Sequence, residues 1–265
     1  MPDARLRLIT VPISHFCEKA RWGLDRLHLP YREEPHAPVF HYPFTLLRGG
    51  KRTVPVLVSR DGVFADSTDI LQYADRSAAP GEALYPSDPE ERRRVVELEE
   101  GFDAELGPAT RLWGYFHLLP DSALAVKILA GSIPPAERAA LPWVFPAART
   151  FMGRAMGLTP AGAKTAIEQV GRIFSQVEAL LADGRRYLVG GRFSAADLTF
   201  ASLSAPVLGP EGYGSALPSL EELPSEMATV IRAFRERPAG QYALRLFRED
   251  RRPASRSRPR RGLTA

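Results

Sequence analysis

Two side chains near the N-terminus have the types and spacing suited to thiol chemistry. Residues 12–22 read PISHFCEKARW, so the only cysteine of the chain, Cys17, follows Ser14 by three positions. The preceding run LRLITV is short, apolar and partly β-branched, as in a buried strand. Both residues therefore lie where a strand gives way to a helix. The residues alone leave open whether Cys17, Ser14 or neither does chemistry there.

A helix start of this kind favours a thiolate. Aligned peptide dipoles and unpaired N–H groups stabilise negative charge, which lowers a thiol pKa from its usual value of about 8.5. Alternatively, Ser14 simply caps the helix predicted over residues 18–27. Cys17 falls in the first helical turn and is otherwise a small buried apolar residue. His15 is a general base only if its ring turns toward this position.

The first 77 residues indicate a small domain of strands and helices. Strands are predicted at residues 5–11, 31–35 and 53–59, and after a hairpin turn at 60–62. Residues 36–52 are rich in proline, aromatic residues and glycine, so we expect an irregular segment with at most one short helix. The order βαβ, hairpin, helix predicts an α/β arrangement.

Two motifs in this domain are unusual for their positions. Pro55 interrupts the apolar run TVPVLVS, although proline removes a ladder donor and belongs at strand starts, edges or bulges. Asp66 and Ser67 open a helix that we expect to end near Arg76. The start of that helix suits an anion, although such a pair is also an ordinary capping motif.

The character of the sequence changes after residues 78–90, a turn-rich linker. Ser87 or Asp88 can cap a long helix with Pro89 in its first turn. From there to about residue 237 the pattern is helical, and we expect prolines to interrupt it, among them those at 142, 146 and 206. Ser194 and Asp197 form a capping-box-like pair to which we assign a structural role.

Motifs of these types in this order resemble the cytosolic glutathione transferase family, over residues 5–247. The resemblance implies an α+β thioredoxin-like N-terminal domain that binds glutathione, followed by an all-α C-terminal domain that completes the pocket for an electrophile. The predicted boundaries are 1–77 for the first domain, 78–90 for the linker, 91–250 for the helical domain and 251–265 for a disordered basic tail.

The resemblance also implies roles for residues of the glutathione site. In serine-type transferases the residue at the position of Ser14 hydrogen-bonds the glutathione sulfur, so Ser14 is the expected catalytic residue. The backbone of Val54, before a cis-Pro55, is expected to pair with the cysteinyl part of glutathione. Asp66 and Ser67 are expected to hold the γ-glutamyl end.

Five further residues are open candidates. Lys51 and Arg52 either bind the glycyl carboxylate of glutathione or belong to a solvated loop, and His41 is a secondary candidate for the same role. Cys17 becomes the nucleophile if Ser14 lies too far from the sulfur. Tyr115, in the cluster WGYF, either faces the electrophile pocket or packs in the core.

The expected function is that of a homodimeric glutathione transferase in detoxification, which conjugates the thiolate of its co-substrate glutathione to a small apolar electrophile. Two alternatives stay open: a non-catalytic glutathione-binding or interaction protein, and a thiol transferase or isomerase that uses Cys17. Residues 120–160 are longer than expected between two helices of this family. They form either an inserted lid or an enlarged dimer surface.

Composition excludes several other classes of protein. Six of the 35 basic residues fall in 251–265, which holds no acid, so the rest carries 29 basic against 31 acidic residues and is not a nucleic-acid-binding surface. No apolar run reaches the roughly 18–20 residues of a membrane span. The N-terminus lacks the apolar core of a signal peptide, so we expect a cytoplasmic protein without membrane contact. A single cysteine and the absence of an HExxH motif predict no metal site.

Overall fold

The computed structural model describes residues 6–251, and its N-terminal part is built on a four-stranded mixed sheet. The strands are β1 (Leu6–Thr10), β2 (Tyr31–Pro35), β3 (Val56–Ser59) and β4 (Gly62–Phe64), in the order β2-β1-β3-β4. β2 is parallel to β1, whereas β3 is antiparallel to both β1 and β4. The helices of this part are α1 (His15–Arg26), α2 (His41–Leu46) and α3 (Ser67–Asp75). This is the predicted α+β thioredoxin-like arrangement.

The strand boundaries follow the sequence closely except at Pro55. β2 covers the predicted range, and Arg5 of the first predicted strand lies outside the described residues. β3 begins at Val56 rather than at Thr53, because Pro55 has no N–H to donate to the ladder. The Val54–Pro55 peptide bond is cis, as predicted.

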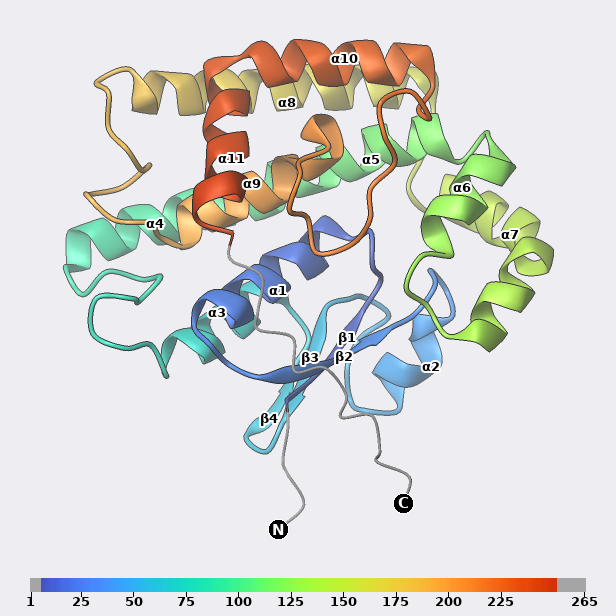
Figure 1. Ribbon diagram of the computed structural model, residues 1–265, viewed down its shortest axis with the longest axis horizontal. Coiled ribbons are helices and arrows are strands. Elements are labelled where there is room, and N and C mark those ends of the chain that lie inside the picture. Colours follow the sequence, from blue (N-terminus) through green and yellow to red (C-terminus); the bar gives the residue numbers. More distant parts are fainter. Residues whose placement is uncertain (1–5, 252–265) are drawn as a thin grey trace, which may run out of the picture.

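In the described residues after the linker, all regular secondary structure is helical. The helices are α4 (Pro89–Gly101), a π-helical turn (Phe102–Leu106), α5 (Gly107–Leu118), α6 (Ser122–Leu129), α7 (Pro135–Ala155), α8 (Pro160–Leu181), α9 (Ala195–Leu208), α10 (Ser225–Glu236) and α11 (Pro238–Glu249). Asp88 caps α4, with its carboxylate accepting from the amide of Glu91 at 2.8 Å. In Figure 1, α1 lies between the sheet and this helical part.

Three prolines expected to interrupt helices lie inside them, so that expectation was wrong. Pro142 and Pro146 lie within α7, and Pro206 lies within α9. A proline costs a helix one hydrogen bond and a steric clash, but buried apolar surface supplies most helical stability in a protein. The buried residues of α7 recur at helical spacing on one face, and Pro142 and Pro146 are on the exposed side.

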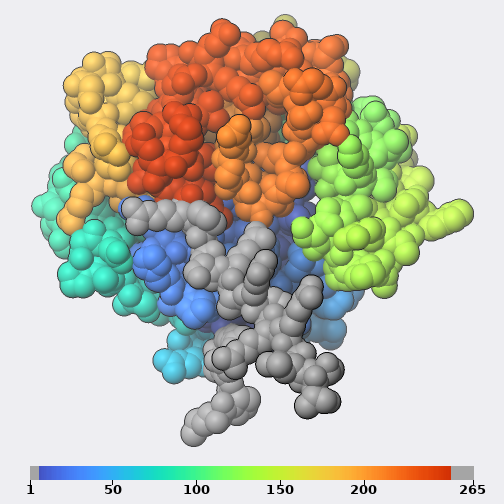
Figure 2. All heavy atoms as spheres, in the orientation of Figure 1, coloured from blue at the N-terminus to red at the C-terminus, as the bar shows by residue number. Residues whose placement is uncertain are grey.

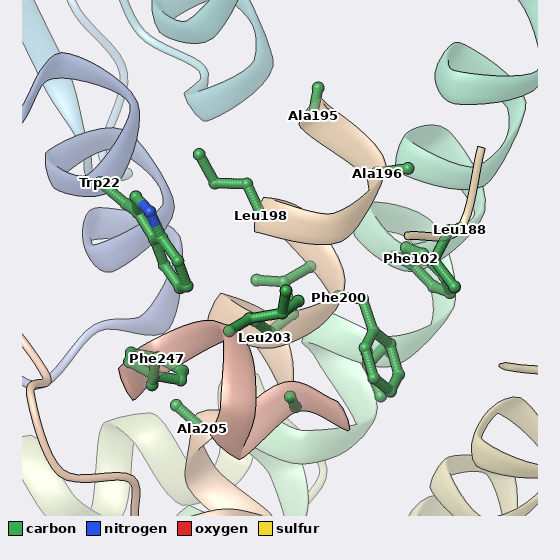
Figure 3. Close-up of a cluster of buried hydrophobic side chains, with 14 of the residues drawn as sticks. Trp22, Phe102, Leu188, Ala195, Ala196, Leu198, Phe200, Leu203, Ala205 and Phe247 are labelled. Carbon is green, nitrogen blue, oxygen red and sulfur yellow. The ribbon is translucent and has the colours of Figure 1, made fainter. Parts of the chain in front are cut away.

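The centre of the helical part is α9, which is buried along nearly its whole length. Figure 3 shows the ring of Trp22 extending from α1 toward Phe247 of α11, and the two ring centroids are 4.8 Å apart. The predicted capping box is present: Asp197 accepts hydrogen bonds from the backbone and side chain of Ser194 at 2.7 and 2.8 Å. Burial raises the pKa of Asp197, and these donors oppose the rise.

Helix α1 is buried on every side although it carries four charged side chains inside the protein. Glu18, Lys19, Arg21 and Asp25 are all buried. A buried charge is tolerated only where a partner compensates it. The Arg21 guanidinium lies 3.0 Å from Glu18 of the same helix and 2.8 Å from Glu33 of β2, and the second pair fastens α1 to the sheet.

The C-terminal end of the described chain completes this set of ion pairs. Arg251 is buried, and its guanidinium lies 2.7 Å from Glu18 and 2.8 Å from Asp25. The predicted tail therefore starts too early, because Arg251 is a fixed part of the fold; residues 252–265 lie outside the described range. Composition alone suggested a solvated arginine, since the two acids that pair with it lie far away in the sequence.

Replacing Arg251 with methionine is expected to lower the free energy of unfolding by about 3–5 kcal/mol. The change leaves Glu18 and Asp25 buried without one of their cations, and breaking a buried pair costs roughly that much. Urea denaturation followed by circular dichroism measures it. Arg248→Met, at an exposed position near the end of α11, is the matched control, with a change within about 0.5 kcal/mol. If both variants were equally stable, Arg251 would belong with the tail after all.

Candidate functional site

Ser14 lies in the turn between β1 and α1 and acts as the N-cap of α1. Its backbone N–H donates to the carbonyl of Val11 at 2.9 Å, which closes the turn. Its Oγ accepts a long hydrogen bond of 3.4 Å from the amide of Cys17. The capping role considered from the sequence is therefore present. It leaves the hydroxyl at the helix start, where the local field favours an anion.

A cleft opens in front of Ser14, between this turn and α5. Its lining is mixed in polarity: Ile13, Ser14, His15, Thr110, Arg111, Gly114, Tyr115, Leu118 and Pro206. The cleft adjoins an apolar chamber bounded by α9, α10 and the loop that joins them, and the two share Ile13, Gly114, Leu118 and Pro206. The site thus has a polar end at Ser14 and an apolar extension toward the C-terminal helices.

The loop between α9 and α10 closes the chamber by docking on the Ser14 turn. The Tyr213 hydroxyl donates to the carbonyl of Ile13 at 2.9 Å. The amide of Gly214 donates to Glu18 at 3.0 Å, and a Cβ at Gly214 would lie only 2.4 Å from that carboxylate. The loop approaches α1 this closely because residue 214 has no side chain.

His15 is neutral and fixes α1 to α5. The ring Nε2 lies 3.0 Å from the carbonyl of Gly107, so the neutral ring donates there. Burial, assisted by the charge of Arg111, lowers the pKa of His15 to about 3. A Cβ at Gly107 would lie 2.4 Å from the ring of Phe16, which shows how closely the two helices pack. His15 is therefore a positioning residue, rather than the general base that the sequence left open.

The low pKa of His15 makes stability depend on pH. The unfolded chain protonates this ring below about pH 6.5, whereas the folded chain keeps it neutral down to about pH 3. The unfolded state therefore binds more protons in this window, and stability falls as the pH drops through it. His15→Gln keeps an N–H donor for Gly107 and removes the titration.

Between about pH 6.5 and pH 5, the His15→Gln variant is expected to lose about 2 kcal/mol less stability than the wild type. Urea denaturation at each pH gives both curves. Other histidines titrate alike in the two proteins, so the difference isolates His15. Parallel curves would mean that the His15 ring titrates as it does in solvent.

Cys17 is fully buried beneath the turn. Burial raises the pKa of its thiol to about 11, and Arg21 and the Ser14 hydroxyl oppose the rise only in part. A thiol of this kind is protonated at neutral pH, whereas reactive cysteines are thiolates at exposed, electropositive positions. The structure places Cys17 where a small apolar residue is expected.

The cis-Pro55 loop lies beside the end of β1, and the start of α3 contacts α1 at Lys19. β1 and β3 are antiparallel and pair Ile9 with Val56. Val54, two residues before Val56, therefore lies beside the C-terminal end of β1. The Asp66 carboxylate caps α3 by accepting from the amide of Thr68 at 2.8 Å. Ser67 is the first residue of α3 and is only 3% exposed. The lining of the cleft in front of Ser14 does not include Val54, Asp66 or Ser67, so their contacts to glutathione stay a prediction.

A buried lysine that sequence reasoning missed holds α3 against α1. Lys19 is fully buried, and its Nζ donates to Thr68 of α3 at 2.7 Å and to Asp103 at 2.6 Å. The same ammonium lies 2.9 Å from Glu99 of α4. The partners of Lys19 are 49 to 84 positions away in the chain. Helical periodicity could not reveal a lysine paired over such distances.

The three candidates for the glycyl end have different surroundings. Lys51 and Arg52 are exposed, as either of their predicted roles requires. His41 is buried, and burial lowers its pKa; its Nε2 donates to the carbonyl of Arg52 at 3.3 Å. His41 thus anchors the loop that carries Arg52.

Tyr115 lies in the cleft wall beside Ser14 and also packs against an apolar cluster, so its contact with the electrophile stays a prediction. Burial raises the pKa of its hydroxyl, and the nearby charge of Arg111 opposes the rise. Arg111, one helical turn earlier on α5, lines the same wall and was not found from the sequence. An arginine on a predicted helix usually indicates a solvated side, and only the tertiary arrangement reveals the cleft.

Residues 120–160 form an arm of two helices that packs on the protein's own chain. Glu137 of α7 accepts from the backbone amide of Ala37 at 2.8 Å and lies 2.5 Å from the His36 ring. An apolar cluster under the arm includes Ile13 and Tyr115 at its border, so the arm supports one wall of the cleft. Figure 2 shows the arm, in green, as a lobe on one side of the molecule.

Neither a membrane span nor a metal site is found in the described part of the chain. Within residues 6–251, no helix is long and apolar enough to cross a bilayer. The same residues hold no cluster of three or more histidine, cysteine, aspartate or glutamate side chains arranged for a metal ion.

Two family models match the sequence of this chain. One, described as glutathione S-transferase, N-terminal domain, matches residues 8–82. The other, described as glutathione S-transferase, C-terminal domain, matches residues 143–211. Together these segments span more than half of the 265 residues. The chain therefore belongs to the glutathione S-transferase family of enzymes.

Solved structures share this fold at low sequence identity. The theta class glutathione S-transferase from the citrus canker pathogen Xanthomonas axonopodis pv. citri, with glutathione bound, matches with a TM-score of 0.56 and 20% identity, over 91% of this chain and 98% of that one. Beta-etherase LigF from Sphingobium sp. strain SYK-6 matches with a TM-score of 0.56 and 18% identity, over 91% and 98%.

A third structure is Ure2p5 from Phanerochaete chrysosporium, cocrystallized with 1-(S-glutathionyl)-2,4-dinitrobenzene. It matches with a TM-score of 0.52 and 20% identity, over 94% of this chain and 97% of that one. At these identities the likeness establishes the common fold. No curated protein sequence matches the chain.

Proposed function

We propose that this protein conjugates the thiolate of glutathione to a small electrophile, with Ser14 as the catalytic residue. The observation that carries the proposal is the position of Ser14: it lies at the start of α1, and it lines a cleft that adjoins an apolar chamber. A hydroxyl donor and the helix dipole together favour a bound thiolate over a thiol. The sulfur then attacks the electrophilic carbon, and either a leaving group departs or a proton is added.

The remaining contacts to glutathione in this proposal come from three segments. The backbone of Val54, before the cis bond to Pro55, pairs with the cysteinyl part. Asp66 and Ser67 hold the γ-glutamyl end at the start of α3, where unpaired N–H groups suit a carboxylate. Lys51 and Arg52 supply positive charge for the glycyl carboxylate.

Of the two alternative functions, the one built on Cys17 has less support than the proposal. The buried, protonated state of Cys17 argues against a thiol transferase or isomerase built on this residue. A homodimer, a cytoplasmic location and a role in detoxification are part of the proposal through the family resemblance alone.

Two matched variants test the proposal. Ser14→Ala is expected to lower kcat/KM for glutathione and 1-chloro-2,4-dinitrobenzene by roughly 10–150-fold at neutral pH, because a hydrogen bond to a charged group is lost. Glutathione affinity in calorimetry should change little, since the other contacts remain. Cys17→Ala, three residues away, should stay within a few-fold of the wild type.

The opposite pattern, with Cys17→Ala inactive and Ser14→Ala active, would replace the proposal with cysteine chemistry. Tight glutathione binding by the wild type without turnover of any electrophile would favour the binding protein.

A further inference from the structure

Arg111 places a positive charge in the wall of the cleft next to Ser14. The residue is on α5, its side chain is exposed, and it lines the cleft together with Ser14 and Tyr115. Its charge reaches its neighbours, because it lowers the pKa of His15 and opposes the rise of the Tyr115 pKa. A cation at this position lines the same cleft as the Ser14 hydroxyl.

The charge of Arg111 has no acidic partner in the part of the chain that the structure describes. None of the carboxylates in residues 6–251 forms an ion pair with it, and none of the residues that line the cleft is acidic. The two titratable neighbours, His15 and Tyr115, are neutral at pH 7 by the direction of their pKa shifts. The guanidinium carbon instead lies 6.0 Å from the ring of Phe16.

An unpaired cation inside a concave wall creates a local positive potential, because the surrounding protein screens it less than open water does. A guanidinium also presents N–H donors in a planar fork that fits a carboxylate. The adjoining chamber is different: its lining is apolar except for Tyr213, whose hydroxyl already donates a hydrogen bond to the carbonyl of Ile13. The cleft therefore offers an anion site at one end and an apolar site at the other.

We infer that Arg111 is a specificity-determining residue that selects electrophiles carrying a carboxylate on an apolar body. The inference rests on the proposed function, and it names the substrate class of that same site. The carboxylate binds the Arg111 fork, the apolar body extends into the chamber, and the electrophilic carbon lies near the sulfur held by Ser14.

The test uses two electrophiles that differ only in charge, 4-chloro-3,5-dinitrobenzoate and its methyl ester. In both, the glutathione thiolate forms a C–S bond at the chlorinated carbon, and chloride leaves with the C–Cl bonding pair. Rates are divided by the uncatalysed rate of each compound, which removes their difference in intrinsic reactivity.

Arg111→Met is expected to lower the corrected kcat/KM for the benzoate by about 10–100-fold, as for a lost charge-assisted hydrogen-bond pair. The ester should change by less than about 3-fold. Arg111→Lys keeps the charge and should restore part of the preference. Arg172→Met, at an exposed arginine of α8 outside the cleft, is the matched control and should resemble the wild type with both compounds.

Three results would overturn the inference. An equal loss with both compounds would mean that Arg111 acts on the thiolate common to them. No loss with either would mean that Arg111 does not reach the substrate. A wild type without preference for the benzoate would mean that the cleft does not select the charge.

A separate measurement decides the inference if the wild type conjugates neither these two compounds nor 1-chloro-2,4-dinitrobenzene, which is the pattern that refutes the proposed function. Calorimetry then compares the two S-aryl glutathione conjugates as ligands. Tighter binding of the carboxylate conjugate by the wild type, lost in Arg111→Met, supports the anion site. Equal binding of both conjugates, or binding of neither, overturns it.

Discussion

The structure depends on the burial of α1, a helix that carries four charged side chains into the interior. Such charges are tolerated only if each finds a partner, and the partners come from both the sheet and the helical part. Glu33 of β2 pairs with Arg21, Glu99 of α4 pairs with Lys19, and Arg251 at the C-terminal end pairs with Glu18 and Asp25. Satisfying α1 therefore fixes the helical part against the sheet. The same contacts fix the start of α1, where Ser14 lies.

This arrangement separates the groups at the site by role. His15 and Cys17 flank Ser14 in the sequence, yet burial keeps the first neutral by lowering its pKa and the second protonated by raising its pKa. Neither carries charge at neutral pH, so the positive potential in the cleft comes from the start of α1 and from Arg111. The apolar chamber beyond has little polarity of its own. The polar side chains are therefore confined to one end of the cleft.

Local features of the fold could be predicted from the sequence because local physics determines them. The strand run before Ser14, the cap at Asp88 and the capping box at Asp197 all follow from residue type and short spacing, whereas the cis-proline at Pro55 was expected from the family resemblance. Features that depend on distant partners could not. Arg251 was assigned to a basic tail because the two acids that pair with it, Glu18 and Asp25, are 233 and 226 positions away in the sequence.

Arg111 was missed for the same reason, since nothing in its neighbourhood in the sequence distinguishes it from an arginine on a solvated helix side.

The central claim is that this protein binds glutathione as a thiolate. The most direct test is an ultraviolet titration of thiolate absorbance for glutathione bound to the wild type. We predict a pKa for the bound thiol at least one unit below the value of about 8.5 for a free thiol. A bound thiol that titrates at the free value would contradict the account.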